Sequence, residues 1–410
     1  MKALYSGKGI KRHVFAALAV LTIAILGLSV LLSACGGNEE TVDTSPIKIG
    51  YLNPFSGPAA FFGPDILSGI QLALDEVNSQ VAGRKIELIQ QDNEGSGEKT
   101  LTVVKNLVEL NKVDILIGMD STPSILPSWD YLVKNNIPLV IPTCILENQP
   151  APHAAITKYA APNIFRVREL ERQFNYEFAQ WLYKNTNARN VMTLALDMPP
   201  GYWAAEGFQK GITDLGGKVV GELYAPPETM DFAPYLAKID PKVVDTLWVW
   251  HTPSAAVGLV RSFDEYGWKD KVQLVGFDIA PEPVIPQFGD SGIGLLVVDQ
   301  YFSGVNTPAN DAFVKAYKAK NNNNNPDALA ESGYDCMKMV LKALEITKGN
   351  TDKQKVVDAL SQIAAAGLGT PRGNLTFSGN QAYGPFYISK IEKVNGQYVS
   401  TVVYSGTLKP

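Results

Sequence analysis

Side chains that can form covalent intermediates or hold a metal are few in this sequence. The chain of 410 residues has three histidines and three cysteines, which are His13, His153, His251, Cys35, Cys144 and Cys336. No pair of histidines has metal-ligand spacing, and neither Cys144 nor Cys336 has a second cysteine nearby in the sequence. We therefore expect no metal, no cofactor and no enzymatic activity, although a catalytic set assembled from distant residues stays open.

Two glycine-rich stretches lack residues that catalytic loops need. In "EGSGEKT" (94–100), Glu98 places a negative charge where a phosphate loop would hold its phosphate, so we interpret the stretch as a helix cap. In "GDSGIG" (289–294), the second glycine of a nucleophile elbow would have to replace Ile293. Neither stretch indicates an active site.

The first 34 residues have the layout of a secretion signal. Four basic residues between Lys2 and Arg12 precede a run from Val14 to Leu32 that contains no charged residue. Because about 20 apolar residues span a bilayer, an uncleaved membrane anchor is the alternative.

The end of this apolar run favours cleavage at a cysteine. Its last residues, "LSAC" (32–35), resemble the lipobox of bacterial lipoproteins, in which the cysteine is acylated and becomes the N-terminus. The resemblance implies a lipoprotein signal peptide at 1–34, lipidation of Cys35 and a flexible tether at 35–46. More than one acyl chain on a residue gives stable attachment to a membrane.

Length and charge limit the classes of protein to which the mature chain can belong. Removing residues 1–34 leaves 376 residues, about right for two lobes, and takes away four of the 36 Lys and Arg and none of the 41 Asp and Glu. The resulting net charge of −9, without a basic stripe, argues against binding to nucleic acid.

The pattern of the mature chain alternates β-rich runs with amphipathic helices, as in parallel sheets covered on both faces. Strands are expected at 47–52, 85–92, 113–119 and 137–143, and in a second set at 190–197, 218–225, 245–251, 271–278 and 294–302. Helices are expected at 64–80, 307–320, 328–349 and 352–362, followed by strands at 373–380, 384–392 and 397–406. These last strands return to lobes that are already built.

Four stretches in this order resemble the branched-chain amino acid binding proteins, the type I substrate-binding proteins of ABC importers. They are "NPFSGPAAFFGPDILSGIQLALDEVN" (53–78), "FRVRELERQFNYEFAQWL" (165–182), "DLGGKVVGELYAPPETMDFAPYLAKI" (214–239) and "ESGYDCMKMVLKALE" (331–345). The resemblance runs along the whole mature chain.

The resemblance implies an α/β protein with the type I periplasmic-binding-protein fold, two doubly wound parallel-sheet lobes joined by three crossovers. The crossovers are expected near Phe165, Gln300 and Arg372. Lobe one would then hold 46–165 plus 301–372, and lobe two 166–300 plus 373–410. A ligand would bind between the lobes and be enclosed by hinge closure.

Ser121 and Thr122 are candidate ligand residues in lobe one. They follow a predicted strand and open a helix, where hydroxyls and free backbone amides attract a carboxylate. By resemblance, Thr122 matches a hydroxyl that binds the ligand carboxylate. The alternative is an ordinary helix N-cap.

Three more lobe-one candidates follow from the resemblance alone. Thr143 and Cys144 match small residues that face the ligand, and Phe62 matches an aromatic wall of the cleft, although a lone phenylalanine fits a core equally well. Ile145 departs from the family, which usually has a hydroxyl there. This departure weakens the expectation of an amino-acid ligand.

In lobe two, Asp278 is the main candidate, because the family has an acid at this position that pairs with the ligand ammonium; a turn or helix cap is the alternative. Pro200 stands where the family often has a tyrosine, and Tyr202 or Trp203 is expected to supply the missing aromatic surface unless both pack the helix onto the sheet. His251 ends a strand as a cleft residue or as a cap.

Together these observations predict an extracytoplasmic solute-binding lipoprotein of an ABC importer, anchored to the bacterial cell membrane and monomeric. Its expected partners are a small-molecule ligand, an ABC permease and its ATPase, and no nucleic acid. The leading ligand is an amino acid with an apolar side chain. An aromatic acid or another small carboxylate or amide is the alternative, as is a ligand-sensing receptor without transport.

Overall fold

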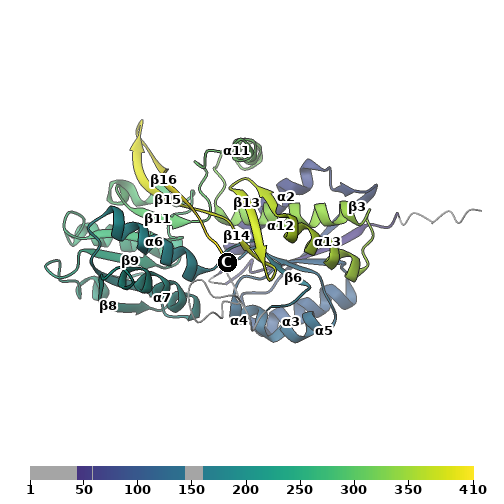
Figure 1. The fold of residues 1–410 in the computed structure, drawn as a ribbon, viewed down its shortest axis with the longest axis horizontal. Coiled ribbons are helices and arrows are strands. Elements are labelled where there is room, and N and C mark those ends of the chain that lie inside the picture. Colours follow the sequence, from purple (N-terminus) through teal and green to yellow (C-terminus); the bar gives the residue numbers. More distant parts are fainter. Residues whose placement is uncertain (1–43, 58, 144–159) are drawn as a thin grey trace, which may run out of the picture. The chain divides into compact units, whose positions relative to one another are not determined.

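The computed structural model describes residues 44–57, 59–143 and 160–410, so the predicted signal peptide and Cys35 lie outside the described residues. By its contacts, Ser45–Pro410 forms one unit that is distinct from Met1–Thr44. Within this unit the chain builds two sheets, each flanked by helices (Figure 1). No helix among the described residues has both the length and the apolar character needed to cross a bilayer.

The first sheet has nine strands in the order β12-β13-β14-β6-β5-β4-β1-β3-β2. Its strands are β1 (Ile47–Asn53), β2 (Gln80–Val81), β3 (Arg84–Asp92), β4 (Ile115–Gly118), β5 (Leu139–Ile141), β6 (Ile164–Arg166), β12 (Leu368–Thr370), β13 (Gly373–Ser378) and β14 (Gln381–Tyr383). The run from β14 through β6, β5, β4 and β1 to β3 is parallel. Antiparallel strands extend both edges.

Helices cover both faces of this sheet because successive residues of a strand point to opposite sides. In β4, Ile115 and Ile117 join a core with α2 (Phe62–Glu76), α12 (Ala328–Ile346) and α13 (Lys353–Ala366). Leu116 between them joins a second core with α3 (Gly97–Lys105) and α5 (Trp129–Lys134). Ser96 caps α3 by accepting from the Lys99 N–H, which confirms the interpretation of "EGSGEKT" as a helix cap.

The second sheet has seven strands in the order β16-β15-β11-β10-β9-β7-β8. Its strands are β7 (Asn190–Leu196), β8 (Lys218–Ala225), β9 (Thr246–Trp250), β10 (Gln273–Phe277), β11 (Leu296–Asp299), β15 (Pro385–Val394) and β16 (Gln397–Thr407). The five strands from β7 to β11 are parallel, whereas β15 and β16 add antiparallel.

The second sheet is also covered on both faces. In β9, Trp248 packs with α6 (Glu171–Asn185) and α7 (Pro199–Thr213), while Leu247 and Val249 pack towards α8 (Ala233–Leu236), α9 (Pro253–Glu265) and α10 (Ile285–Phe288). The latter core also includes residues of α11 (Pro308–Lys320) and α12, so the apolar packing is continuous between the two sheets.

The chain passes between the two sheets after β6, after β11 and between β14 and β15. This pairing corrects the predicted third crossover at Arg372, because residues 373–383 form β13 and β14, and Gln381 of β14 pairs with Arg166 of β6. Short strands in a turn-rich segment add to either sheet equally well on local grounds, and only pairing with β6 selects the first sheet.

Helices α2 and α12 cross at two glycines, which lets their backbones approach closely. A Cβ added to Gly69 would lie 1.7 Å from the carbonyl oxygen of Ala330, and one added to Gly333 would lie 2.0 Å from that of Ile66. Gly258, within α9, has ordinary space, since its added Cβ would lie 3.4 Å from its nearest neighbour, the Met230 oxygen.

We therefore predict that Gly69→Ala lowers the free energy of unfolding by about 1–3 kcal/mol, because the two helices must move apart. The same substitution at Gly258 serves as the control and is expected to be neutral or stabilising by up to about 1 kcal/mol, the gain in helix propensity. Urea unfolding followed by circular dichroism compares the two variants. Equal stability of both variants would contradict the close-packing argument.

Fully buried charges tie the segment after β6, which leads to the second sheet, to α12 and to the turn between β12 and β13. The Arg372 guanidinium lies 2.6 Å from a carboxylate oxygen of Glu169, 3.4 Å from Glu331 and 3.8 Å from Asp335. Arg372 also donates to the backbone oxygen of Val167. Burial raises the pKa of all three carboxyls, and Arg372 opposes this rise.

Arg372→Met should destabilise the protein by about 3–5 kcal/mol at pH 7, because it leaves three buried carboxyls without their cation. The loss should be smaller at pH 5. An acid whose folded-state pKa is raised contributes stability at low pH and loses it as pH rises, and removing Arg372 raises these pKa values further.

Lys338→Met is the control, since Lys338 pairs with Glu76 on the surface at 3.0 Å and is expected to contribute less than about 1 kcal/mol. Unfolding free energies of both variants at pH 5 and pH 7 test the network. A loss in Arg372→Met that is the same at both pH values would show that charge is not the cause.

Candidate ligand cavity

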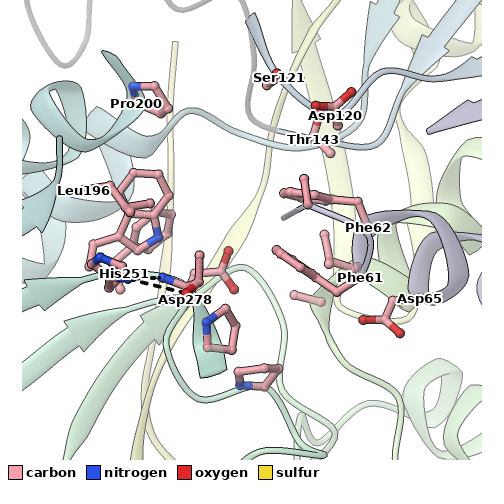
Figure 2. A pocket seen from close by; sticks show the side chains of 18 of the residues that line it. Phe61, Phe62, Asp65, Asp120, Ser121, Thr143, Leu196, Pro200, His251 and Asp278 are labelled. Atoms are coloured by element: carbon pink, nitrogen blue, oxygen red, sulfur yellow. Dashed lines mark hydrogen bonds between the residues drawn. The ribbon is translucent and has the colours of Figure 1, made fainter. Parts of the chain in front are cut away.

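A cavity of about 460 Å³ lies among the loops that follow strands of both sheets. The carboxyl ends of parallel strands and the helices after them commonly form ligand sites in open α/β sheets. Figure 2 shows Phe61, Phe62 and Asp65 across the cavity from His251 and Asp278. The remaining described residues that line it belong mainly to the segments 94–95, 120–122, 196–200, 250–253, 277–282, 299–302 and 327–329, with Thr143, Arg168 and Glu171.

A polar corner of the cavity follows β3, β4 and β5 of the first sheet. The Asp120 carboxylate accepts from the Asn93 side-chain amide and from the Ser124 hydroxyl, each at 2.8 Å. Thr143 donates its hydroxyl to the Met119 backbone oxygen at 2.7 Å, which ties the end of β5 to the end of β4. This corner offers the Ser121 hydroxyl together with a negative charge.

Aromatic pairs form apolar walls on both sides of the cavity. Phe61 and Phe62 stack with ring centroids 4.4 Å apart at the start of α2. Trp250 and Phe277, at the ends of β9 and β10, lie 5.8 Å apart. These rings suit an apolar or flat part of a ligand.

A group of three charges lies on the second-sheet side, where β10 and β11 end. Nη2 of Arg168 lies 2.9 Å from Oδ1 of Asp299 and 3.2 Å from Oδ2 of Asp278. The Asp278 side chain is 30% exposed, compared with 7% for Asp299 and 3% for Arg168. Asp278 is therefore the member of the group that a ligand can reach most readily.

Two further carboxyls lie close to each other beside the start of α12. Burial, followed by the charge of Asp327, raises the pKa of Asp65 to about 7. Burial also raises the pKa of Asp327 to about 6, although this residue caps α12 by accepting from the Ala330 N–H at 2.8 Å. Their proximity in a buried corner disfavours the state in which both are ionised.

His251 lines the cavity, and its ring bonds to neighbouring backbone groups, whereas the N-cap residue of α9 is Thr252. The Thr252 N–H donates to Nδ1 at 2.9 Å, which assigns the ring proton to Nε2, 3.1 Å from the Pro226 oxygen. Burial lowers the pKa of His251, which favours the neutral ring.

The charges around the cavity are strongly unequal. Among the described lining residues, nine carry a carboxyl group, namely Asp65, Glu94, Asp120, Glu171, Glu228, Asp278, Glu282, Asp299 and Asp327. In the same set of residues, the guanidinium of Arg168 is the fixed positive charge, and it is already bound to two of those carboxyls. This arrangement attracts cationic groups and repels anions.

The structure brings most of the predicted ligand residues together at the cavity. Those that line it are Phe62, Ser121, Thr122, Thr143, His251 and Asp278. Cys144 lies outside the described residues.

Tyr202 and Trp203 are not among the described residues that line the cavity, which corrects that prediction. Helix α7 buries Ala204, Ala205 and Phe208 against the sheet, and helical spacing then directs Tyr202 towards Asp197 and Tyr224. Trp250 and Phe277 supply the aromatic surface of the second lobe instead.

Sequence reasoning missed Arg168 and Asp299, although Asp299 carried a visible signal. It follows the buried strand "LLVV" in the same way that Asp278 follows "LVGF", and acids just past parallel strands meet at one edge of a sheet. Arg168 lies two residues beyond β6 in a segment rich in charges, and nothing local distinguishes it from its neighbours Arg166 and Arg172.

The fold matches solved transport proteins. An ABC transporter substrate-binding protein from Sphaerobacter thermophilus superposes with a TM-score of 0.82 at 27% identity, covering 88% of this chain and 98% of that chain. A solute-binding protein of an ABC transporter from Rhodopseudomonas palustris, solved with 3,4-dihydroxybenzoic acid, gives a TM-score of 0.79 at 26% identity over 90% and 99% of the two chains. The predicted type I periplasmic-binding-protein fold is therefore confirmed.

Sequence comparison leads to the same family. Leu/Ile/Val-binding protein homolog 6 of Brucella suis is 26% identical over 344 residues, which cover 82% of this chain and 85% of that protein. The family model described as "Periplasmic binding protein" matches residues 46–397. The chain belongs to this periplasmic binding protein family and is a solute-binding protein of the ABC-transporter type, not an enzyme.

Proposed function

We propose that this protein captures an amino acid with an apolar side chain outside the cytoplasm and delivers it to an ABC permease with its ATPase. The observation that carries the proposal is the order of groups around the cavity. Hydroxyls of Ser121 and Thr122 lie on the first-sheet side beside Thr143, whose hydroxyl proton is already donated to Met119, and the Asp278 carboxylate lies on the second-sheet side. The carboxylate of an amino acid matches the hydroxyls, its ammonium group matches Asp278, and an apolar side chain matches the aromatic walls.

The charges of the cavity support a ligand that carries an ammonium group. A ligand with only a carboxylate would have to enter beside nine carboxyl-bearing side chains, and Arg168 is already bound to Asp278 and Asp299. The name of the Brucella suis relative, a Leu/Ile/Val-binding protein homolog, agrees with this class of ligand.

An aromatic acid is the second candidate. The stacked rings of Phe61 and Phe62 and the pair of Trp250 and Phe277 provide surfaces for a flat ring. The Rhodopseudomonas palustris protein, solved with 3,4-dihydroxybenzoic acid, supports this reading by analogy. A receptor that senses either ligand without transport would use the same cavity, and an uptake assay in cells that lack the gene separates transport from sensing.

Binding on both sides of the cavity favours closure of the two lobes. A ligand that contacts Ser121 on one side and Asp278 on the other binds more tightly when those sides approach, and so it shifts the population towards the closed state. Hinge closure of this kind is the expected working motion of the protein.

Asp278→Asn should weaken binding of an amino acid by about 30-fold or more. Removing one member of a buried charge pair costs about 2–5 kcal/mol, and about 1.4 kcal/mol corresponds to tenfold in affinity. Asn is close in shape to Asp and tolerates the left-handed backbone at this position, where φ is 51°, so the fold should be retained. A thermal-shift screen of amino acids and aromatic acids selects the ligand, and calorimetry measures the loss.

Asp358→Asn, on the exposed face of α13, is the matched control and should leave affinity unchanged. An aromatic acid without an ammonium group should bind Asp278→Asn as well as or better than the wild type, because a negative charge is removed. Equal binding of an amino acid to the wild type and to Asp278→Asn would rule out the role given to Asp278.

The lipid anchor is a separate part of the proposal and rests on "LSAC" (32–35). Cys35→Ser removes the thiol that would be acylated, so the variant should lose metabolic labelling with a fatty acid and should lose its membrane fraction. Ser33→Ala keeps a small residue before the cysteine and should still be labelled. Recovery of the wild-type protein with Met1 intact would contradict the anchor.

A further inference from the structure

Asp278 and Asp299, at the ends of β10 and β11, both bond to the same nitrogen atom of Arg168. Oδ1 of Asp299 and Oδ2 of Asp278 both lie within hydrogen-bond distance of Nη2 of Arg168, at 2.9 and 3.2 Å. The two carboxyl groups are therefore no farther apart than the sum of these distances. Since the guanidinium carries one positive charge, it cannot neutralise both carboxylates at once.

The backbone holds the two acids in this arrangement. The Asp278 N–H donates to the Val298 oxygen at 3.2 Å, immediately before Asp299 in the chain. The Gln300 N–H donates to Oδ1 of Asp299 at 2.7 Å. Asp278 adopts the left-handed conformation, which is costly for most residues and persists only where the surroundings require it.

Asp299 is the member of the pair that favours its protonated form. Burial raises the pKa of Asp299 well above its usual range, and the Asp278 carboxylate raises it further through its charge and a hydrogen bond, whereas Arg168 lowers it. Asp299 therefore retains its proton over a pH range in which a solvent-exposed aspartate is ionised.

The other charged groups near the pair do not replace this proton. Asp327 at the start of α12 is anionic when ionised and interacts with both Asp278 and Arg168. Glu169 and Glu331 also interact with Arg168, but Arg372 is bound to both of them. The described groups that face the pair thus carry more negative than positive charge.

We propose that Arg168 is a positioning residue that holds Asp278 and Asp299 as one paired acceptor, and that the ammonium group of the ligand binds there in place of the proton on Asp299. The inference rests on the proposed function, and it narrows the ligand to small molecules with a primary ammonium or similar cationic group. On binding, the proton leaves to solvent, so two carboxylates face one guanidinium and one ammonium. No covalent bond forms or breaks apart from the O–H bond of the Asp299 carboxyl group.

The first test needs no ligand. Aspartate labelled with ¹³C at Cγ reports the titration of Asp299 by NMR, with Asp299→Asn used to assign its signal. Arg168→Gln should move the Asp299 midpoint to higher pH because a cation is lost, and Asp278→Asn should move it to lower pH because a neighbouring negative charge is lost. Arg168→Lys keeps the charge and should restore most of the wild-type midpoint.

Arg261→Gln, an exposed arginine of α9 on the same lobe, is the matched control and should leave the Asp299 midpoint unchanged. An Asp299 that titrates in the ordinary carboxyl range, or whose midpoint ignores both Arg168→Gln and Asp278→Asn, would overturn the inference. A general loss of structure in Arg168→Gln would not imitate the expected result, since the two variants must shift the midpoint in opposite directions.

The second test measures proton release during binding of L-leucine. Calorimetry in two buffers of different ionisation enthalpy should show release of up to one proton per leucine at pH values below the Asp299 midpoint. Affinity should fall by about tenfold per pH unit below that midpoint, since protonation competes with the ammonium. In Arg168→Gln this fall should begin at higher pH.

3,4-Dihydroxybenzoate separates the two ways in which Arg168 could contact a ligand. If Arg168→Gln abolishes its binding and the Asp299 midpoint does not move, Arg168 binds ligand carboxylates directly and the inference is refuted. If the wild type binds no amino acid of the panel, the proposed function fails. The NMR titrations still decide whether Arg168, Asp278 and Asp299 form the paired acceptor.

Discussion

Buried charge where the segment after β6 meets α12 and the β12–β13 turn is the constraint on which the rest of this structure depends. Arg372 lies between β12 and β13 and binds Glu169 from the segment after β6, together with Glu331 and Asp335 from α12. These groups bring parts of the chain that are far apart in sequence to one point. Because a buried guanidinium must stay paired with carboxylates, this contact fixes where the segment after β6 meets α12 and the β12–β13 turn.

A second buried arginine, Arg168, lies at the cavity. Arg168 precedes Glu169, and its side chain binds Asp278 and Asp299 at the ends of β10 and β11. Its backbone oxygen accepts from the Gln381 side chain of β14 at 2.7 Å. Asp278 is therefore joined by one ion pair, to Arg168, to the segment after β6, one of those about which the lobes would move. In the proposed function, ligand recognition would thus be linked to lobe movement by direct contact.

The sequence predicted most of the strands and helices because their apolar residues follow the period of each element. Asp278 and the hydroxyls after β4, which it proposed as ligand residues, line the cavity, since loops after parallel strands meet at one edge of a sheet. The sequence left open whether Tyr202 or Trp203 lines the cavity or packs the helix, because the direction in which a helix faces depends on packing that no local pattern records. It missed Arg168 for a related reason: a side chain in a connecting segment acquires its partners only when both sheets are assembled.

The strand order has a consequence for the way in which the chain assembles. Strands β7 to β11 are consecutive in sequence and can pair as they emerge, whereas β6 waits for β14, so that Arg166 meets Gln381 only when nearly the whole chain is present. Until then β6 exposes an unpaired edge, which is a template for pairing with another chain. A product truncated before β14 would keep that edge and would be prone to aggregate. β14, the last strand of the first sheet in sequence, therefore protects the edge of β6 only after the chain has been synthesised as far as Tyr383.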